Sequence, residues 1–570
     1  MQAAIDAFYD WQGGLVWLKM EGGEPEADLV RGTLRRFGGG HATLVRAPDS
    51  LRAATAVFEP QPGPLRRLTA TEYRNTVRDL FGTDIVVPSS LEEDQRPDEH
   101  GLVAVGVSTF SVSSAGVQKY EDAAYSLAEQ ALVQAEDPAA FVGCTPGGTV
   151  DGACASRFLE RFGRRAWRRP LSPAERDRLV AIADDAAERT GDFHQGLVYA
   201  VATVLQSPNF VFRAEVGKPS PTRAGWNELT DYELATRLSY LLWSTTPDDA
   251  LLDAVAAGDL TTPAGLEAEV RRMLEDPKAR QGLRAFFDDM LILDKLLETS
   301  EIQKDPTVFL HYNAEVGPSA REETLRFLED LVFEREGSWG EAFTSRRTFI
   351  DRTLASIYAV PAPAREGFGA YEFPAEAGRR GILGHVSFLI ANSNRATSSA
   401  TKRGAYIRQV LLCQPIPPPP PDVDTALEPS SPSAPTLRDR VARHLQDPTC
   451  ASCHQLMDPL GLGLENFDAL GRWRTTENDV TIDPSGYLND GVAFDDAAGL
   501  AEVLADSDLA HDCLVRTLYR YGTGHHEVAS ESAALRDLQR SFEASDLNVK
   551  ALLLALATSD ALRFVLPPSD

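Results

Sequence analysis

The sequence lacks any run of about eighteen uncharged apolar residues, the length that a membrane-spanning helix requires. We therefore expect no integral membrane segment. The opening residues, Met1-Gln-Ala-Ala-Ile-Asp6, contain no basic stretch followed by an apolar one, which is the pattern of a secretory signal. We predict that this start carries no export signal.

Familiar catalytic signatures are missing as well. We find no nucleotide-binding glycine loop, no Gly-x-Ser-x-Gly elbow and no His-Glu-x-x-His motif. Basic residues are in the minority, with 56 Lys and Arg against 84 Asp and Glu, so the formal net charge is −28. A surface this acidic repels nucleic acid phosphates and anionic lipids, and we expect neither as the main partner. The charge suits a basic redox partner protein, and it equally suits simple solubility.

The 570 residues exceed what one hydrophobic core usually organises, so we expect several domains. From Leu65 onward apolar residues recur at helical spacing, and Thr69 with Glu72 forms a capping box at the first such segment. The pattern predicts a mainly α, multi-domain helical protein with minor β-hairpins. Further helices are predicted near 117–134, 154–167, 172–190, 195–207, 230–243, 264–274, 279–296, 318–335 and 509–521.

Residues 1–64 form a separate small α/β piece in this interpretation, ending at the proline-rich Pro60-Gln-Pro-Gly-Pro64. Within it we predict a strand, a helix and a second strand, at 14–20, 26–37 and 41–46. A second proline-rich run, 416–435, favours an extended linker because its prolines exclude a helix. Between these two pieces we predict four helical segments, at 65–140, 141–215, 216–345 and 346–415. A compact module at 436–570 follows the linker.

Two of the six cysteines, Cys144 and Cys154, lie ten residues apart in a loop rich in Gly and Thr. So short a turn-rich loop closes readily as a disulfide, which would indicate a periplasmic or extracellular location. Two unrelated thiols are the alternative. Cys413 and Cys513 are single cysteines, and whether they pair with each other stays open at this point.

The remaining cysteines belong to Cys450-Ala-Ser-Cys453-His454, which matches Cys-x-x-Cys-His, the attachment sequence of c-type haem. The two thiols bond the two vinyl groups of the porphyrin and must lie one helical turn apart. The histidine that follows reaches the iron as its proximal ligand. The motif predicts covalent haem c on Cys450 and Cys453, with His454 on the iron, inside the small module at 436–570.

Two other interpretations of the motif stay open. Zinc would need four ligands, whereas Cys450, Cys453 and His454 supply three, and adjacent Cys453 and His454 fit one tetrahedron poorly. A local disulfide between Cys450 and Cys453, as in thioredoxin-like motifs, would be expected in a βαβ context, which the sequence does not predict here.

The sixth iron position is not settled by the motif. Met457 lies three residues after His454, on the same side of the iron, and we expect it to serve packing. Four histidines of the module are candidate distal ligands, namely His444, His511, His525 and His526. A filled sixth position would favour electron transfer, and an open one would permit peroxide chemistry.

Other charged clusters have structural explanations beside functional ones. Asp458, Glu465 and Asp468 follow the haem motif at a spacing that fits no EF-hand and gives no matched catalytic pair, so we expect structural roles. A small hairpin is predicted over 480–494. The basic cluster Arg164–Arg169 would suit an anionic saccharide, a haem propionate, or ion pairs with the surplus carboxylates.

Several sequence motifs together resemble those of one bacterial family, which is known as domain of unknown function 1592. They are Arg66–Gly82, Arg164–Leu171, Leu205–Arg213, Arg237–Ser244, Arg380–Gly384, Lys402–Gly404 and Cys450–Arg474. The resemblance covers residues 65–570 and implies a secreted protein of several segments with a cytochrome-c-like segment near its C-terminus. It implies no substrate. Members usually begin with an export signal, so haem loading of this chain would require a true start upstream of Met1.

Residues 1–64 resemble a different protein, the FAD-binding subunit of glycolate oxidase at its C-terminal end. The matching phrases are Trp11–Leu18 and Gly39–Pro48. The match contains none of the flavin-contacting core of that family, and we therefore expect no flavin. The segment is interpreted as a fused piece or as the result of a misplaced start, and either would explain the missing export signal.

Three functions follow as hypotheses. The first is an extracytoplasmic haem protein for electron transfer or redox support, with a redox partner protein or a polysaccharide as partner. The second is a secreted binding or scaffold protein without haem, in which Cys450 and Cys453 form a structural disulfide. The third is a haem-dependent peroxidase, which requires an open distal site.

Overall fold

The computed structural model describes residues 5–10, 15–20 and 65–567, apart from a few internal positions. The positions left out are 111, 299, 301, 311, 418–426, 428, 443–445, 447 and 489–490. Helices dominate the described chain and its strands are short, so the prediction of a mainly α protein is confirmed. The predicted helix at 26–37, the strand at 41–46 and His444 lie outside the described residues.

The described part of the N-terminal piece is one antiparallel strand pair. Strand β1 (Ile5–Asp10) pairs with β2 (Leu15–Met20), with Ile5 opposite Met20. Strand β2 coincides with the β-like run predicted at 14–20.

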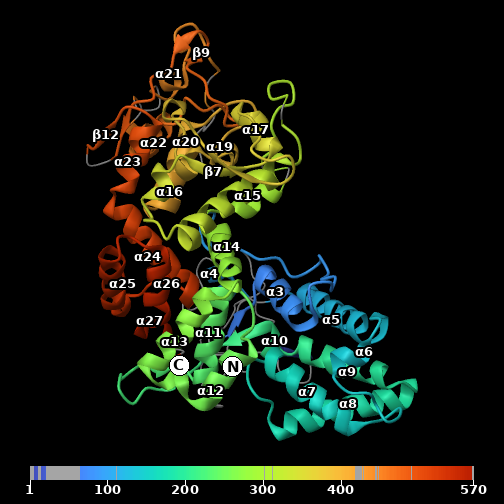
Figure 1. The fold of residues 1–570 in the computed structure, drawn as a ribbon. Coiled ribbons are helices and arrows are strands. Elements are labelled where there is room, and N and C mark those ends of the chain that lie inside the picture. Colours follow the sequence, from blue (N-terminus) through green and yellow to red (C-terminus); the bar gives the residue numbers. More distant parts are fainter. Residues whose placement is uncertain are drawn as a thin grey trace.

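The helices between residues 70 and 211, apart from α4 (Val103–Thr109), form one lobe, drawn in blue and cyan in Figure 1. Thr69 caps the first of them in a capping box with Glu72, and Ser172 caps α8 in the same way. Their apolar faces enclose a core of their own, which contains the fully buried rings of Phe158 and Phe210. The helices are α3 (Ala70–Phe81), α5 (Ser114–Glu129), α6 (Pro138–Val142), α7 (Gly152–Ala166), α8 (Pro173–Thr190), α9 (Phe193–Gln206) and α10 (Pro208–Val211).

A second body unites helices from the middle and from the end of the chain. In Figure 1 the red C-terminal helices lie beside the green α11 and α13, and contacts join α24 to α11 and α26 to α13. Its helices are α4 (Val103–Thr109), α11 (Asp231–Trp243), α12 (Asp249–Ala257), α13 (Pro263–Glu275), α14 (Lys278–Met290), α24 (Asp508–Thr523), α25 (Ser532–Ala544), α26 (Val549–Ala557) and α27 (Asp560–Arg563). Segments that are distant in sequence therefore share one core.

The remaining helices form the lobe that carries the haem motif, in yellow and orange in Figure 1. They are α15 (Val316–Glu329), α16 (Glu341–Thr344), α17 (Arg352–Tyr358), α18 (Gly381–Gly384), α19 (Val386–Ala391), α20 (Ala400–Tyr406), α21 (Leu437–Ala442), α22 (Pro448–Leu462) and α23 (Ala497–Ala505). A π-helical turn, η7 (Ile407–Leu411), continues α20.

Short strand pairs complete the described fold. In the haem lobe β7 (Arg347–Ile350) pairs with β8 (Gly369–Glu372). The hairpin of β11 (Gly486–Tyr487) with β12 (Ala493–Phe494) lies within the range 480–494 where one hairpin was predicted. A second hairpin, β9 (Thr476–Glu477) with β10 (Val480–Thr481), begins before that range. The other pairings are β3 (Leu65–Arg67) with β4 (Phe212–Ala214), and β6 (Asn227–Glu228) with β5 (Lys218–Pro219) and β13 (Phe564–Val565).

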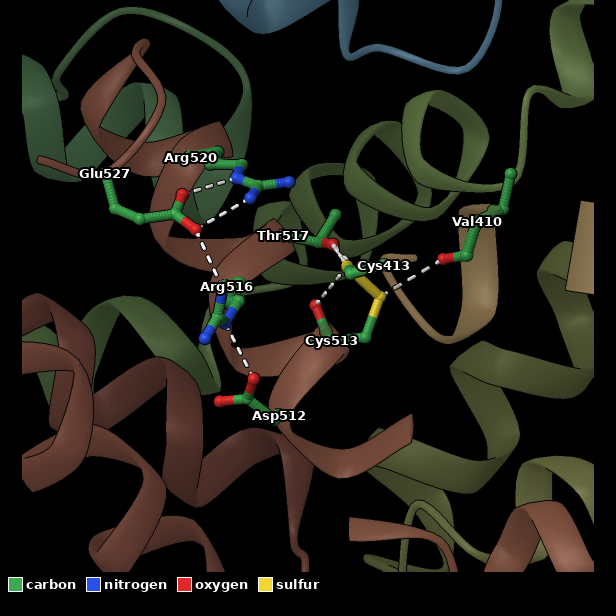
Figure 2. The surroundings of a disulfide bond; sticks show 8 residues. All are labelled: Val410, Cys413, Asp512, Cys513, Arg516, Thr517, Arg520 and Glu527. Carbon is green, nitrogen blue, oxygen red and sulfur yellow. Dashed lines mark hydrogen bonds and ion pairs between the residues drawn. A yellow bond between two sulfur atoms is a disulfide. The ribbon is translucent and has the colours of Figure 1, made fainter. Parts of the chain in front are cut away.

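Two disulfides are present. One joins Cys144 to Cys154, beside the start of α7. The other joins Cys413 to Cys513, across 100 residues of sequence, and so links the end of η7 to α24. Figure 2 shows this second bond with Arg516 and Arg520 of α24 nearby, both of which pair with Glu527.

Within the described ranges, no helix is both long enough and apolar enough to cross a bilayer.

Candidate functional site

The motif Cys450-Ala-Ser-Cys453-His454 lies in the first turns of α22, whose helical backbone places the two cysteines one turn apart. Both thiols are free and partly exposed, whereas the four other cysteines of the chain are joined in disulfides. Two accessible thiols on one helix turn are the arrangement that covalent attachment to two vinyl groups requires.

The imidazole of His454 is oriented by a buried carboxylate one turn further along the helix. Its Nδ1 lies 2.9 Å from Oδ2 of Asp458, a residue that is 1% exposed. Thr401 of α20 donates its hydroxyl to the other carboxylate oxygen at 2.8 Å. The hydrogen bond to Asp458 raises the pKa of His454, which partial burial opposes. With the proton on Nδ1, the lone pair lies on Nε2, the nitrogen that would face a metal.

Helix α22 is fixed by a close crossing with α20. A Cβ added to Gly404 would lie 1.8 Å from the carbonyl oxygen of Met457, and one added to Gly461 would lie 1.8 Å from that of Ala400. Only glycine permits this approach of two backbones. Met457 itself is buried, in keeping with the packing role expected for it.

The turn that follows the motif is tied down by a buried arginine. Arg403, which has no exposed surface, donates hydrogen bonds to the carbonyl oxygens of Leu464, Phe467 and Asp468. Glu465 accepts from Arg474 at 2.7 Å, close to Arg403. The acidic residues after the motif therefore have structural partners, as expected from their spacing.

A small apolar cluster accompanies the motif helix, apart from the two large cores. It consists of Ala400, Leu437, Val441 and Leu462, with Leu427 packed against it. Among the described residues, no group of three His, Cys, Asp or Glu side chains is placed to hold a bare metal ion. Haem brings its own four nitrogen ligands and requires two thiols and one oriented imidazole from the chain. The residues present fit that group.

The distal candidates have contacts elsewhere. His511 donates from Nε2 to the carbonyl oxygen of Ala505 at 2.8 Å. His525 lies 3.5 Å from a carboxylate oxygen of Glu531, and His526 borders a cavity of about 40 Å3 beside the Cys413–Cys513 disulfide. None of these contacts involves α22, so the structure does not bring the three histidines to His454.

The basic cluster Arg164–Arg169 is engaged within the protein. Arg164 forms ion pairs with Asp249 and Asp253, and Arg169 is bidentate on Glu175. Arg168 is buried and donates to backbone carbonyls, at Asn209, Phe210 and Phe212. The ion-pair interpretation of this cluster agrees with these contacts.

One polar network had no sequence signal. The fully buried Glu323 accepts hydrogen bonds from Tyr358 at 2.6 Å and from Thr348 at 2.8 Å, and burial raises its pKa to about 7. Beyond Thr348 the network continues through His385, at 3.3 Å, to Thr324. Burial lowers the pKa of His385 to about 3, so the ring is neutral.

Five family models match successive parts of the chain, each described as a protein of unknown function. In chain order they are DUF1587 over 66–133, DUF1595 over 154–215, DUF1592 over 229–360, DUF1588 over 379–477 and DUF1585 over 490–562. The chain belongs to this multi-segment, DUF1592-type family. The DUF1588 model, which spans the haem motif, carries the short name PSCyt3, a hint of a cytochrome-like segment.

The other comparisons add no relative, since no curated protein and no solved structure matches the chain. Residues 1–64 lie outside all five family matches. The resemblance of that piece to glycolate oxidase therefore stays a prediction.

Proposed function

We propose that this protein is an extracytoplasmic c-type haem protein that serves electron transfer or redox support. The haem is bound covalently by Cys450 and Cys453, and His454 is the proximal iron ligand. One observation carries the proposal: the only two free thiols lie one helical turn apart, directly before an imidazole that a buried carboxylate orients. When bound, haem supplies a one-electron couple.

The chain contributes attachment and orientation. Cys450 and Cys453 hold the porphyrin edge, and Asp458 keeps the proton of His454 on Nδ1. The crossing of α20 with α22 prevents the motif helix from shifting, because the two backbones are in contact at Gly404 and Gly461.

The disulfides indicate the cellular location of the protein, and its net charge indicates the kind of redox partner. Two disulfides point to an oxidising compartment outside the cytoplasm. The net charge of −28 favours a basic redox partner protein over an acidic one. A polysaccharide is the alternative partner, and neither a nucleic acid nor a membrane lipid is proposed.

The scaffold hypothesis without haem is less well supported. It requires Cys450 and Cys453 to form a disulfide, whereas the two thiols are separate and the other four cysteines are paired. The peroxidase hypothesis requires an open sixth coordination position on the iron. A low-spin, six-coordinate spectrum in both redox states would count against it.

The test is a pyridine haemochrome spectrum of the full chain, exported behind a signal peptide in a host with cytochrome c maturation machinery. We expect an α-band typical of two thioether links, and its loss in the double variant Cys450→Ala, Cys453→Ala. The matched control is Cys144→Ala, Cys154→Ala, which removes two cysteines without touching the motif. A colourless wild-type protein, from a host that loads a control cytochrome, would contradict the proposal.

A further inference from the structure

Both oxygens of the Asp458 carboxylate have a defined partner. Oδ2 faces Nδ1 of His454 at 2.9 Å, and Oδ1 accepts the hydroxyl hydrogen of Thr401 at 2.8 Å. Asp458 is 1% exposed, so water does not compete for either oxygen. A carboxylate held in this way has one position and one orientation toward the imidazole.

The arrangement depends on two elements that are distant in sequence. Asp458 and His454 are one turn apart on α22, while Thr401 belongs to α20. The glycine contacts at Gly404 and Gly461 bring the two backbones together and thereby place Thr401 opposite Asp458. The carboxylate is thus part of a built support for His454.

A carboxylate on Nδ1 has two consequences for an imidazole that binds iron through Nε2. It fixes the tautomer and the direction of the ring, and it increases the negative charge on the ring, which makes Nε2 a stronger donor. A stronger axial donor stabilises ferric more than ferrous iron and so lowers the reduction potential.

We propose that Asp458 is a positioning residue that orients His454 and lowers the reduction potential of the haem, with Thr401 moderating the charge of its carboxylate. The proposal rests on the proposed function, because it concerns the bound haem. Asp458 would thus influence the reduction potential of the iron without touching the iron itself.

The test compares midpoint potentials of the haem-loaded full chain in redox titrations. Asp458→Asn keeps the shape of the side chain and removes its charge, and we expect a higher potential than in the wild type. Thr401→Val removes the hydroxyl that withdraws charge from the carboxylate, and we expect a lower potential. Asp495→Asn, at an exposed residue of the same lobe, removes the same charge and should leave the potential unchanged.

Shifts of opposite sign in the two variants would support the proposal, since a general loosening of the site would move both potentials in one direction. Equal potentials in Asp458→Asn and the wild type would overturn it. Should Asp458→Asn fail to fold, as judged by circular dichroism, Thr401→Val decides alone, and an unchanged or raised potential then overturns it. A colourless wild type is a different result, which rejects the proposed function itself.

Discussion

Several buried cations of this molecule are satisfied by backbone carbonyls. Arg403 holds three carbonyl oxygens of the turn after the haem motif, and Arg66 holds those of Tyr521 and Gly522 at the end of α24. Lys304 donates to two more, and burial lowers its pKa to about 7. Carbonyls at helix ends and in tight turns lack intrahelical partners, which is why these side chains are placed there.

Glu323 is a buried acid, and among the described residues no cation lies close enough to form an ion pair with it. Its hydrogen bonds come from Tyr358 and Thr348, while the positive charge of Arg379 acts on it only through space. Burial is the largest influence on its pKa and raises it from 4.5 to about 7. The folded state therefore holds a proton on Glu323 over a range in which the unfolded state does not.

Because the pKa of Glu323 is higher in the folded than in the unfolded state, its contribution to the free energy of unfolding falls as the pH rises. Stability contributed by the protonated Glu323 is complete below pH 4.5 and is lost as the pH rises to about 7. We predict that Glu323→Gln, which cannot ionise, gains stability relative to the wild type across this window, by up to about 3 kcal/mol. Denaturant midpoints of both proteins at pH 5 and pH 8 measure the difference, because other groups cancel in the comparison.

Glu376→Gln is the matched control, since Glu376 is exposed. Its pH profile should run parallel to that of the wild type. If the profile of Glu323→Gln were parallel as well, the carboxyl of Glu323 would be ionised at both pH values, contrary to this account.

Among the elements, the crossing of α20 and α22 matters most for the site. Oxygen atoms of the backbone lie where the side chains of Gly404 and Gly461 would be, so neither helix can carry a larger residue at the crossing. The same crossing places Arg403 over the turn that follows α22. One contact thus supports both the helix that carries His454 and the loop after it.

We predict that Gly404→Ala pushes the two helices apart, because the new Cβ would lie 1.8 Å from the carbonyl oxygen of Met457. Overpacking of this kind costs about 1–3 kcal/mol. Thermal unfolding and the haem content per chain measure the effect, and both should fall. Gly148→Ala, where a Cβ meets nothing within 4 Å, is the control and should change neither. Full haem content in Gly404→Ala would show that attachment tolerates a displaced α20.

Much of this local structure could be predicted from the sequence. The capping boxes at Thr69 and Ser172 start helices where expected, because a cap depends on residues three positions apart. The crossing at Gly404 could not be predicted, since its partner Met457 is remote in sequence and nothing local indicates the contact. His454 and Asp458 show the same limit: their spacing was visible, but the burial of Asp458 depends on α20.

At the scale of the whole molecule, the family segments do not correspond to separate bodies. Helices α24 and α26 belong to the segment over 490–562, yet they pack on α11 and α13 of the segment over 229–360. Strand β13 near the chain end pairs with β6, next to the start of that middle segment. Consequently the C-terminal segment supports the middle of the chain, and the haem lobe is joined to both.

The two disulfides differ in the length of chain that they constrain in the unfolded state. A disulfide stabilises mainly by limiting the unfolded chain, and the loop closed by Cys413–Cys513 spans 100 residues against 10 for Cys144–Cys154. We predict that Cys413→Ala, Cys513→Ala costs about 1–2 kcal/mol more than Cys144→Ala, Cys154→Ala. Guanidinium unfolding of the two double variants, followed by helical circular dichroism, gives the comparison. An equal or larger loss from the short loop would show that local structure around α7, rather than chain entropy, decides the contribution of these bonds.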